Sequence, residues 1–275
     1  MFKKQFWGLL SILSVAAWLQ AHPSPALALQ KEERSLDCND TWRNGRLATH
    51  CDMREQTIPA LGGTLAVDGR MNGSISMRGW NRSDILIRAK VQTSAPTDSE
   101  ATDVARQIVI ETNGSRIRAE GPSQGRDLNW SVSYEVFVPQ TSNLSLTTHN
   151  GGIRISDIRG RVEFTAINGG VSLRRLAGSV RGDTTNGGLS IELAGTQWEG
   201  DGLDVRTTNG GITMWVPENY SAQLETGTVN GGLNVDFPIT VQGRLNRELS
   251  VKLGYGGPMV RAMTTNGGVR IQRKT

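Results

Sequence analysis

The sequence contains an Asn-Gly-Gly motif that recurs six times in its C-terminal half. The copies begin at Asn150, Asn168, Asn186, Asn209, Asn230 and Asn266. Successive copies lie 18, 18, 23, 21 and 36 residues apart. Repeats of this period are typical of architectures in which one small supersecondary unit is stacked many times. The chain is therefore expected to fold as a stack of short, similar layers.

The residues on both sides of each motif alternate between apolar and polar. Apolar side chains stand six residues before each Asn, and three and five residues after it. The residue between the last two is polar in every copy: Arg154, Ser172, Ser190, Thr213, Asn234 and Arg270. Alternation with period two is typical of strands that are buried on one face. Each repeat is predicted to be a strand, an Asn-Gly-Gly turn and a second strand.

Asn-Gly is a strong signal for a tight hairpin turn because both residues tolerate a positive φ. The second Gly offers further backbone freedom or room for a close neighbour. A single hairpin cannot bury its apolar face alone, whereas stacked copies can, which predicts a β-solenoid. In such a stack the six Asn side chains would form one hydrogen-bonded ladder, and the Thr residues two positions earlier would form a second. The alternative is a plain exposed turn.

The N-terminal half predicts a β-rich cap at residues 29–140, followed by the solenoid at residues 141–275. The cap contains a degenerate turn at Asn72-Gly73 and one helix, at about 98–108, which Thr97 or Asp98 caps. Further elements are strands at 64–67, 73–77, 85–91 and 130–138, a hairpin at Asn113-Gly114, and a loop at 195–202 over the edge of the core.

The N-terminus has the pattern of a secretory signal peptide at residues 1–28. Lys3 and Lys4 precede an apolar run at 6–19, which is shorter than the ~20 residues that span a bilayer. The small residues at 26–28 predict cleavage after Ala28, and an uncleaved anchor is the alternative. We therefore expect an exported, periplasmic or extracellular protein with no stable membrane insertion after cleavage.

Charge and cysteine content narrow the classes of partner. The full chain has 30 basic and 26 acidic residues, a net charge of +4. Removing residues 1–28 takes away two lysines and no acidic residue, so 28 basic residues remain and the net charge falls to +2. No run of Lys or Arg is present to follow a phosphate backbone, so no nucleic-acid partner is expected. Cys38 and Cys51, the two cysteines, predict a disulfide in an oxidising compartment. With His50 beside Cys51 they offer too few ligands for a zinc site.

The sequence contains no catalytic motif that is recognisable by spacing, and we predict no cofactor and no metal. One alternative is a glycan-active enzyme that uses Glu199, Asp201 and Asp204, since such sites need paired carboxylates. Trp198 and Trp215 could stack on a sugar ring, or could instead cap the edge of the core. His149 occupies a variable position of the repeat.

Two segments, 207–222 and 253–268, resemble a bacterial putative-adhesin family of β-strand repeats, a domain of unknown function. The Cys38/Cys51 pair, Gly79-Trp80 and Gly121-Pro122 are similar to further features of its secreted members. The resemblance covers residues 35–273. It implies a cell-envelope repeat protein with no agreed ligand and no catalytic residues. Some relatives resemble partners in envelope-stress signalling, which is a second functional alternative.

These observations predict an all-β fold, a β-solenoid of stacked strands with a β-rich N-terminal cap that contains one short helix. The predicted function is that of a non-enzymatic, adhesin-like binding or structural module of the cell envelope. Its partner would be an envelope polymer or a protein. The candidate ligand contacts are Trp198, Trp215, Arg154 and Arg270.

Overall fold

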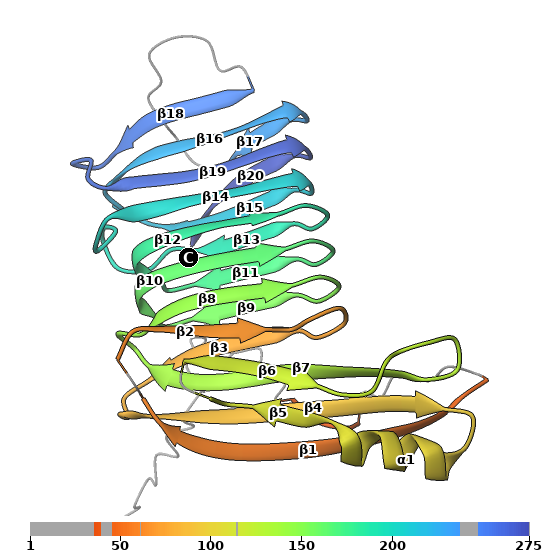
Figure 1. Ribbon diagram of the computed structural model, residues 1–275. Helices are drawn as coiled ribbons and strands as arrows, with labels where there is room; N and C mark the ends of the chain where they lie inside the picture. Colours follow the sequence, from red (N-terminus) through yellow and green to blue (C-terminus); the bar gives the residue numbers. More distant parts are fainter. Residues whose placement is uncertain (1–35, 40–45, 61, 114, 237–246, 275) are drawn as a thin grey trace, which may run out of the picture. The chain divides into compact units, whose positions relative to one another are not determined.

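The computed structural model describes residues 36–39, 46–60, 62–113, 115–236 and 247–274. The predicted signal peptide at 1–28 lies outside these residues. Leu36–Thr275 form one compact unit. Its described part contains two ten-stranded sheets and one helix, so the predicted all-β fold with one short helix is confirmed (Figure 1).

The first sheet, sheet A, contains the strands that follow the Asn-Gly-Gly turns. In spatial order they are β1 (Ala48–Pro59), β4 (Asp84–Ala95), β7 (Asn129–Pro139), β3 (Ile75–Trp80), β9 (Ile153–Ser156), β11 (Val171–Arg174), β13 (Leu189–Glu192), β15 (Ile212–Pro217), β20 (Val269–Lys274) and β17 (Leu233–Val235).

The second sheet, sheet B, contains the strands that precede the turns. In spatial order they are β18 (Glu248–Leu253), β16 (Ala222–Asn230), β19 (Met259–Asn266), β14 (Gly202–Asn209), β12 (Ala177–Thr184), β10 (Arg159–Ala166), β8 (Asn143–Thr148), β2 (Thr64–Asp68), β6 (Arg116–Glu120) and β5 (Val109–Glu111).

The two strands of a repeat therefore belong to different sheets, and the hairpin prediction is wrong. The strand β10, for example, pairs in parallel with β8 and β12, its counterparts in the neighbouring repeats. Each Asn-Gly-Gly segment is an arch that leads the chain from sheet B to sheet A (Figure 1). Alternation reports which face of a strand is buried, and it is the same in an arch and in a hairpin. We call one sheet-B strand, its arch and its sheet-A strand a rung.

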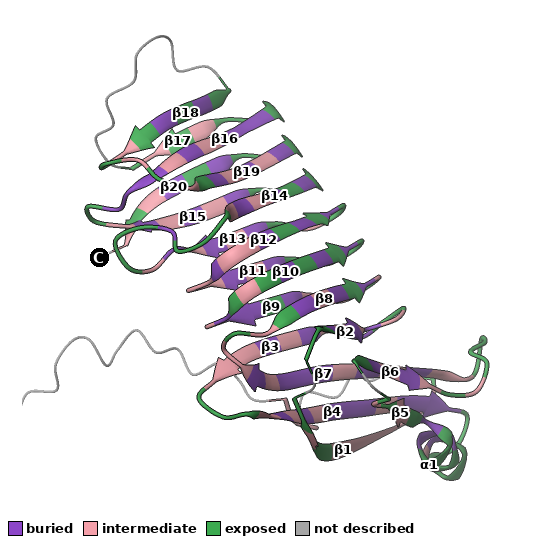
Figure 2. Ribbon diagram, turned by 60° about the vertical axis from the view of Figure 1, so that its left-hand side comes forward, coloured by how far each residue is buried: buried purple, intermediate pink, exposed green. Residues whose placement is uncertain are grey.

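The core lies between the two sheets and is filled by the apolar positions of the repeat (Figure 2). The residue six positions before each Asn is at most 2% exposed in every rung. The residues three and five positions after it are equally buried, except Leu233 and Val235 in the end strand β17. Burying such aliphatic side chains contributes about 1.5–3 kcal/mol each, so stacking supplies most of the stability that a single rung lacks.

The rungs are not stacked in the order of the sequence. The last rung, β19–β20, lies between the rungs of Asn209 and Asn230, because β19 pairs with both β14 and β16. The strand β18 then pairs antiparallel with β16 and forms the edge of sheet B. The 36-residue interval between Asn230 and Asn266 thus contains the edge strand β18 and the segment that connects it to β19.

The solenoid begins earlier than residue 141. The strands β2 and β3 pair with β8 and β9, and Asn72 occupies the turn between them. Both sheets thus continue without a break from the predicted solenoid into the predicted cap. The helix α1 (Asp98–Gln107) is where the sequence predicts it, with Thr97 as its N-cap in a capping box with Glu100. The strands β5 and β6 form the predicted hairpin, although its Gly114 lies outside the described residues.

The Asn side chains form one continuous ladder along the arches. Each Nδ2 donates to the Oδ1 of the Asn in the adjacent rung, at 2.7–3.0 Å. The ladder runs through seven residues: Asn72, Asn150, Asn168, Asn186, Asn209, Asn266 and Asn230. The amides are all oriented in the same direction, so their dipoles reinforce one another.

The arches need glycine for close stacking and not for a positive φ. No residue of the six motifs has a φ in the left-handed region. A Cβ on Gly169 would lie 2.1 Å from the carbonyl oxygen of Gly151, and a Cβ on Gly187 would lie 2.1 Å from that of Gly169. The first Gly of each motif therefore lets successive backbones touch, whereas the turn geometry that the sequence suggested is not used.

The threonines do not form a second ladder. Thr148, Thr184, Thr207 and Thr264 each donate to the carbonyl oxygen of the first Gly in the adjacent rung. These buried hydroxyls satisfy carbonyls that the closely stacked arches would otherwise leave without a partner. Thr228, in the end rung, is buried and its hydroxyl has no partner within the described residues.

The predicted disulfide is present. Cys38 and Cys51 are bonded, with their Cα atoms 5.8 Å apart, and the bridge ties residues 36–39 to β1. In the loop-entropy account a bridge that closes so short a loop contributes about 3 kcal/mol.

Candidate functional site

The outward face of sheet A carries one row of polar side chains that the repeat places in exact cross-strand register. The register joins each member to the next: Ser76, Arg154, Ser172, Ser190, Thr213, Arg270 and Asn234. We call this set the sheet A row. Arg154 and Arg270 are exposed, and neither guanidinium has an ion-pair or hydrogen-bond partner in the described part of the chain.

Beside this row lies a cluster of paired charges around Glu192. Its carboxylate accepts hydrogen bonds from Arg174 on β11 at 3.0 Å and from Lys274 on β20 at 2.6 Å. Because β15 separates β13 from β20, Lys274 reaches across β15 to do so. Burial acts to raise the pKa of Glu192, but the hydrogen bonds and charges of Lys274 and Arg174 outweigh it and hold the pKa below its ordinary value.

Replacing Glu192 by Gln is expected to weaken the acid dependence of stability. A carboxylate with a lowered folded-state pKa stabilises the protein above its unfolded pKa, and this contribution disappears as the pH falls through the folded pKa. Glu192→Gln should therefore cost about 1 kcal/mol near neutral pH and should lose less stability than the parent between about pH 6 and pH 3. The free energy of unfolding, measured in urea across that range, checks this. Parallel curves for the two proteins would contradict it.

The two tryptophans have different environments. Trp198 is only 3% exposed, and its Nε1 donates to the carbonyl oxygen of Gly178 at 3.0 Å. This burial favours the alternative interpretation, in which Trp198 caps the edge of the core, and its role as a ligand contact stays an untested prediction. Trp215 is partly exposed on sheet A beside Glu192, with which it pairs in register. Its role as a ligand contact stays a prediction.

Two of the three acidic residues of the candidate enzyme site are paired with arginines. Glu199 pairs with Arg159. Asp204 lies on β14, 3.4 Å from Arg206 and 4.0 Å from Arg261, and Asp201 is exposed. Carboxylates that are paired with arginine are poor candidates for a general acid, which needs a proton to donate. Nothing in this geometry favours the glycosidase alternative.

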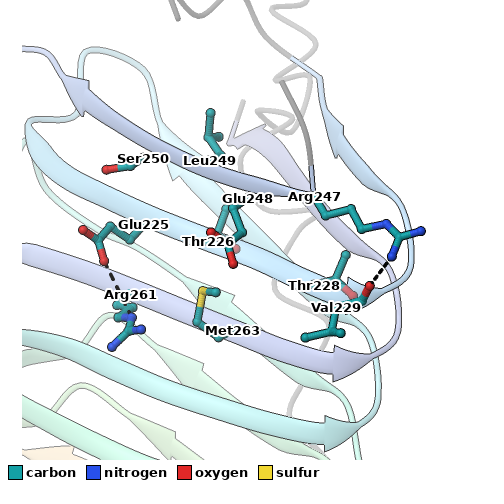
Figure 3. A pocket seen from close by; sticks show the side chains of 10 residues that line it. All are labelled: Glu225, Thr226, Thr228, Val229, Arg247, Glu248, Leu249, Ser250, Arg261 and Met263. Carbon is teal, nitrogen blue, oxygen red and sulfur yellow. Dashed lines mark hydrogen bonds and ion pairs between the residues drawn. The ribbon is translucent and has the colours of Figure 1, made fainter. Parts of the chain in front are cut away.

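A cavity of about 910 Å³ opens on β16, β18 and β19, at the end of the stack where β18 is the edge strand of sheet B (Figure 3). An ion pair between Arg261 and Glu225, at 3.6 Å, lies along one side. On the other side Arg247 donates to the carbonyl oxygen of Val229 at 2.6 Å. Since these charged groups have partners within the chain, the cavity has the character of a solvated groove beside an edge strand.

Among the described residues, no three His, Cys, Asp or Glu side chains come together as a metal site would require. The part of the chain that the structure describes also has no helix of sufficient length and apolarity to cross a bilayer. His149 is partly buried, and its main chain bonds to Arg70 and Asn168 as part of the arch.

Comparison with known proteins identifies the family. Residues 61–272 match the model of the Toastrack domain DUF4097. No curated protein matches the chain. Similar solved structures include one named a putative cell adhesion protein, from Clostridium sporogenes, at 11% identity and a TM-score of 0.46, covering 81% of this chain and 100% of the other.

Two further structures are similar at a lower level. One is named a putative adhesin, from Bacteroides fragilis, at 11% identity and a TM-score of 0.33, covering 81% of this chain and 97% of the other. The other is named a putative lipid binding protein, from Parabacteroides distasonis, at 10% identity and a TM-score of 0.32, covering 82% and 97%. Since the family model spans most of the sequence, the chain belongs to the Toastrack family, a domain family of unknown function.

Proposed function

We propose that this protein is an exported, non-enzymatic binding module of the cell envelope that contacts its partner through the sheet A row. The supporting observation is the row itself, which the repeat carries in register across seven adjacent strands. Strands of a sheet lie ~4.8 Å apart, so the row is a regular linear array of polar groups. Extended surfaces of this kind suit repetitive or elongated partners.

The two unpaired arginines define the partner's charge. Arg154 on β9 and Arg270 on β20 are four strand spacings apart, roughly 19 Å. Between them lie the uncharged Ser172, Ser190 and Thr213. A polymer that carries separated anionic groups along a polar backbone matches this pattern. The Cys38–Cys51 disulfide supports export, because such bonds persist in oxidising compartments.

A binding assay with charge-deleted variants tests the proposal. Arg154→Ala/Arg270→Ala should reduce binding to purified peptidoglycan or lipopolysaccharide about tenfold or more, and added salt should weaken binding by the parent protein. Arg161→Ala/Arg181→Ala is the matched control, since it removes two exposed arginines from sheet B. Equal losses in both variants would show only a nonspecific effect of charge. Binding to neither polymer would exclude them as partners and direct the search to a protein.

A further inference from the structure

A second cavity, of about 520 Å³, lies at the opposite end of the stack from that in Figure 3. Here the long strands β1, β4 and β7 run past the arches (Figure 1). The cavity is lined by residues of these strands and by two arch residues, Asn72 and Asn150. We call it the amide pocket. Neither Arg154 nor Arg270 lines it.

The lining of the amide pocket carries no Asp, Glu, Lys or Arg, although such residues make up 20% of the chain. Trp130 belongs to the lining but is itself only 6% exposed: its Nε1 donates to the carbonyl oxygen of Pro122, and the guanidinium of Arg70 lies 5.5 Å from its ring.

Half of the residues in this lining have polar side chains that are not used within the described part of the protein. Thr49, Gln92, Ser94, Asn129 and Ser131 make no side-chain hydrogen bond to any described residue. Ser94 is only 3% exposed. The other four side chains are partly exposed, so water reaches them when no ligand is bound. Five hydrogen-bonding side chains that are not engaged elsewhere surround one cavity, an arrangement that suits a ligand with many hydrogen-bonding groups.

The Asn ladder adds a further donor. Every Nδ2 in the ladder donates towards the rung nearer β7, and the last one, on Asn72, has no Asn beyond it. A Cβ on Gly73 would lie 2.1 Å from the carbonyl oxygen of Val132, so Asn72 lies next to Ser131. The Nδ2 of Asn72 has no partner among the described residues, and Asn72 is one of the residues that line the pocket. Polarisation along the ladder makes it a stronger donor than an isolated amide.

This chemistry selects a class of ligand. Anions would require cationic groups and metal ions would require carboxylates, and the lining supplies neither. An extended peptide binds through an open sheet edge. Here β4 and β7 are each paired on both sides, and the free edge of β1 lies on the side away from β4, so the pocket itself offers side chains. Amides and hydroxyls both donate and accept, as sugar hydroxyls do. We propose that the amide pocket binds an uncharged oligosaccharide.

Isothermal titration calorimetry of the purified protein tests this with neutral tetrasaccharides of glucose and of N-acetylglucosamine, and with tetragalacturonate as the charged comparison. We expect saturable binding of a neutral probe and weaker binding of the uronate. Gln92→Ala/Asn129→Ala should weaken binding roughly tenfold or more, because two hydrogen-bonding groups are lost. Both positions are partly exposed, so circular dichroism should show an unchanged fold.

Arg154→Ala/Arg270→Ala serves as the matched control, since it alters the sheet A row and leaves the amide pocket intact. Loss of envelope-polymer binding in this variant, with oligosaccharide binding retained, would separate the two sites. The proposal is overturned if no neutral tetrasaccharide binds at millimolar concentration. It is also overturned if tetragalacturonate binds as tightly as the neutral probes, or if Gln92→Ala/Asn129→Ala binds like the parent.

Discussion

Gly169→Ala is expected to destabilise the protein by about 3 kcal/mol or more, whereas Gly170→Ala should cost less than about 1 kcal/mol. The two residues are adjacent in one motif, and neither has a positive φ. A Cβ on Gly169 would lie 2.1 Å from the carbonyl oxygen of Gly151, a backbone atom that cannot move without separating two rungs. The nearest atom to a Cβ on Gly170 is the oxygen of Gly188, at an ordinary 3.5 Å.

Unfolding in guanidinium chloride, followed by circular dichroism, measures both changes. The comparison separates two accounts of the motif. If turn flexibility is what the glycines provide, the two variants should be equally destabilised. If close stacking is the reason, only the first glycine should be intolerant, and Gly187→Ala should repeat the effect in the next rung.

Phe164→Ala is the second change with a large expected effect, about 3–5 kcal/mol. Phe164 is 3% exposed and lies in register with Gly182 on the neighbouring strand. A Cβ on Gly182 would lie 2.5 Å from the ring of Phe164, so the aromatic ring fills the space that the glycine leaves. Removing the ring opens a cavity over the backbone of Gly182.

The partner glycine supplies the test of that explanation. Gly182→Ala alone should cost about 1–3 kcal/mol, because it crowds the ring. In the double variant Phe164→Ala/Gly182→Ala the new methyl group occupies part of the cavity, so the loss should be smaller than the sum of the two single losses by about 1 kcal/mol or more. Strict additivity in the thermodynamic cycle would show that the ring and the glycine do not act as a pair.

The sequence was sufficient to predict the layers of this fold. Residues such as Val162 and Ile155 recur at constant distances from each Asn, and their burial follows directly from that periodicity. The Asn ladder was predictable for the same reason, because in-register stacking must bring equivalent side chains together. The helix could be located because Thr97 and Glu100 form a capping box just before an apolar face.

The partners of the strands could not be predicted in the same way. A side-chain pattern with period two is compatible with both a hairpin and an arch. The pattern therefore does not reveal that β10 pairs with β8 and β12. The sequence pattern also does not reveal that β19 lies between β14 and β16. Leu203, Val260 and Leu224 are all apolar, and any order of their strands would bury them.

The candidate sites show the same limit. The sheet A row could be recognised from the repeat because Arg154 and Arg270 occupy one repeat position. Trp198 could not be placed, because a tryptophan in a Gly-rich loop has no periodic neighbour to show which way it faces. The amide pocket joins Thr49, Gln92 and Asn129 from three strands with no common motif, so only the folded structure brings them together.

The place of the last rung bears on how this chain can be shortened. In most stacked proteins the final repeat is an end layer, and trimming it leaves the others in contact. Here the closing residues, Met259–Lys274, form an inner layer that touches rungs on both sides. A ribosome must synthesise residues 259–274 before this layer can form. Deleting these residues would therefore remove material from inside the stack and leave the rung of Asn230 without its neighbour.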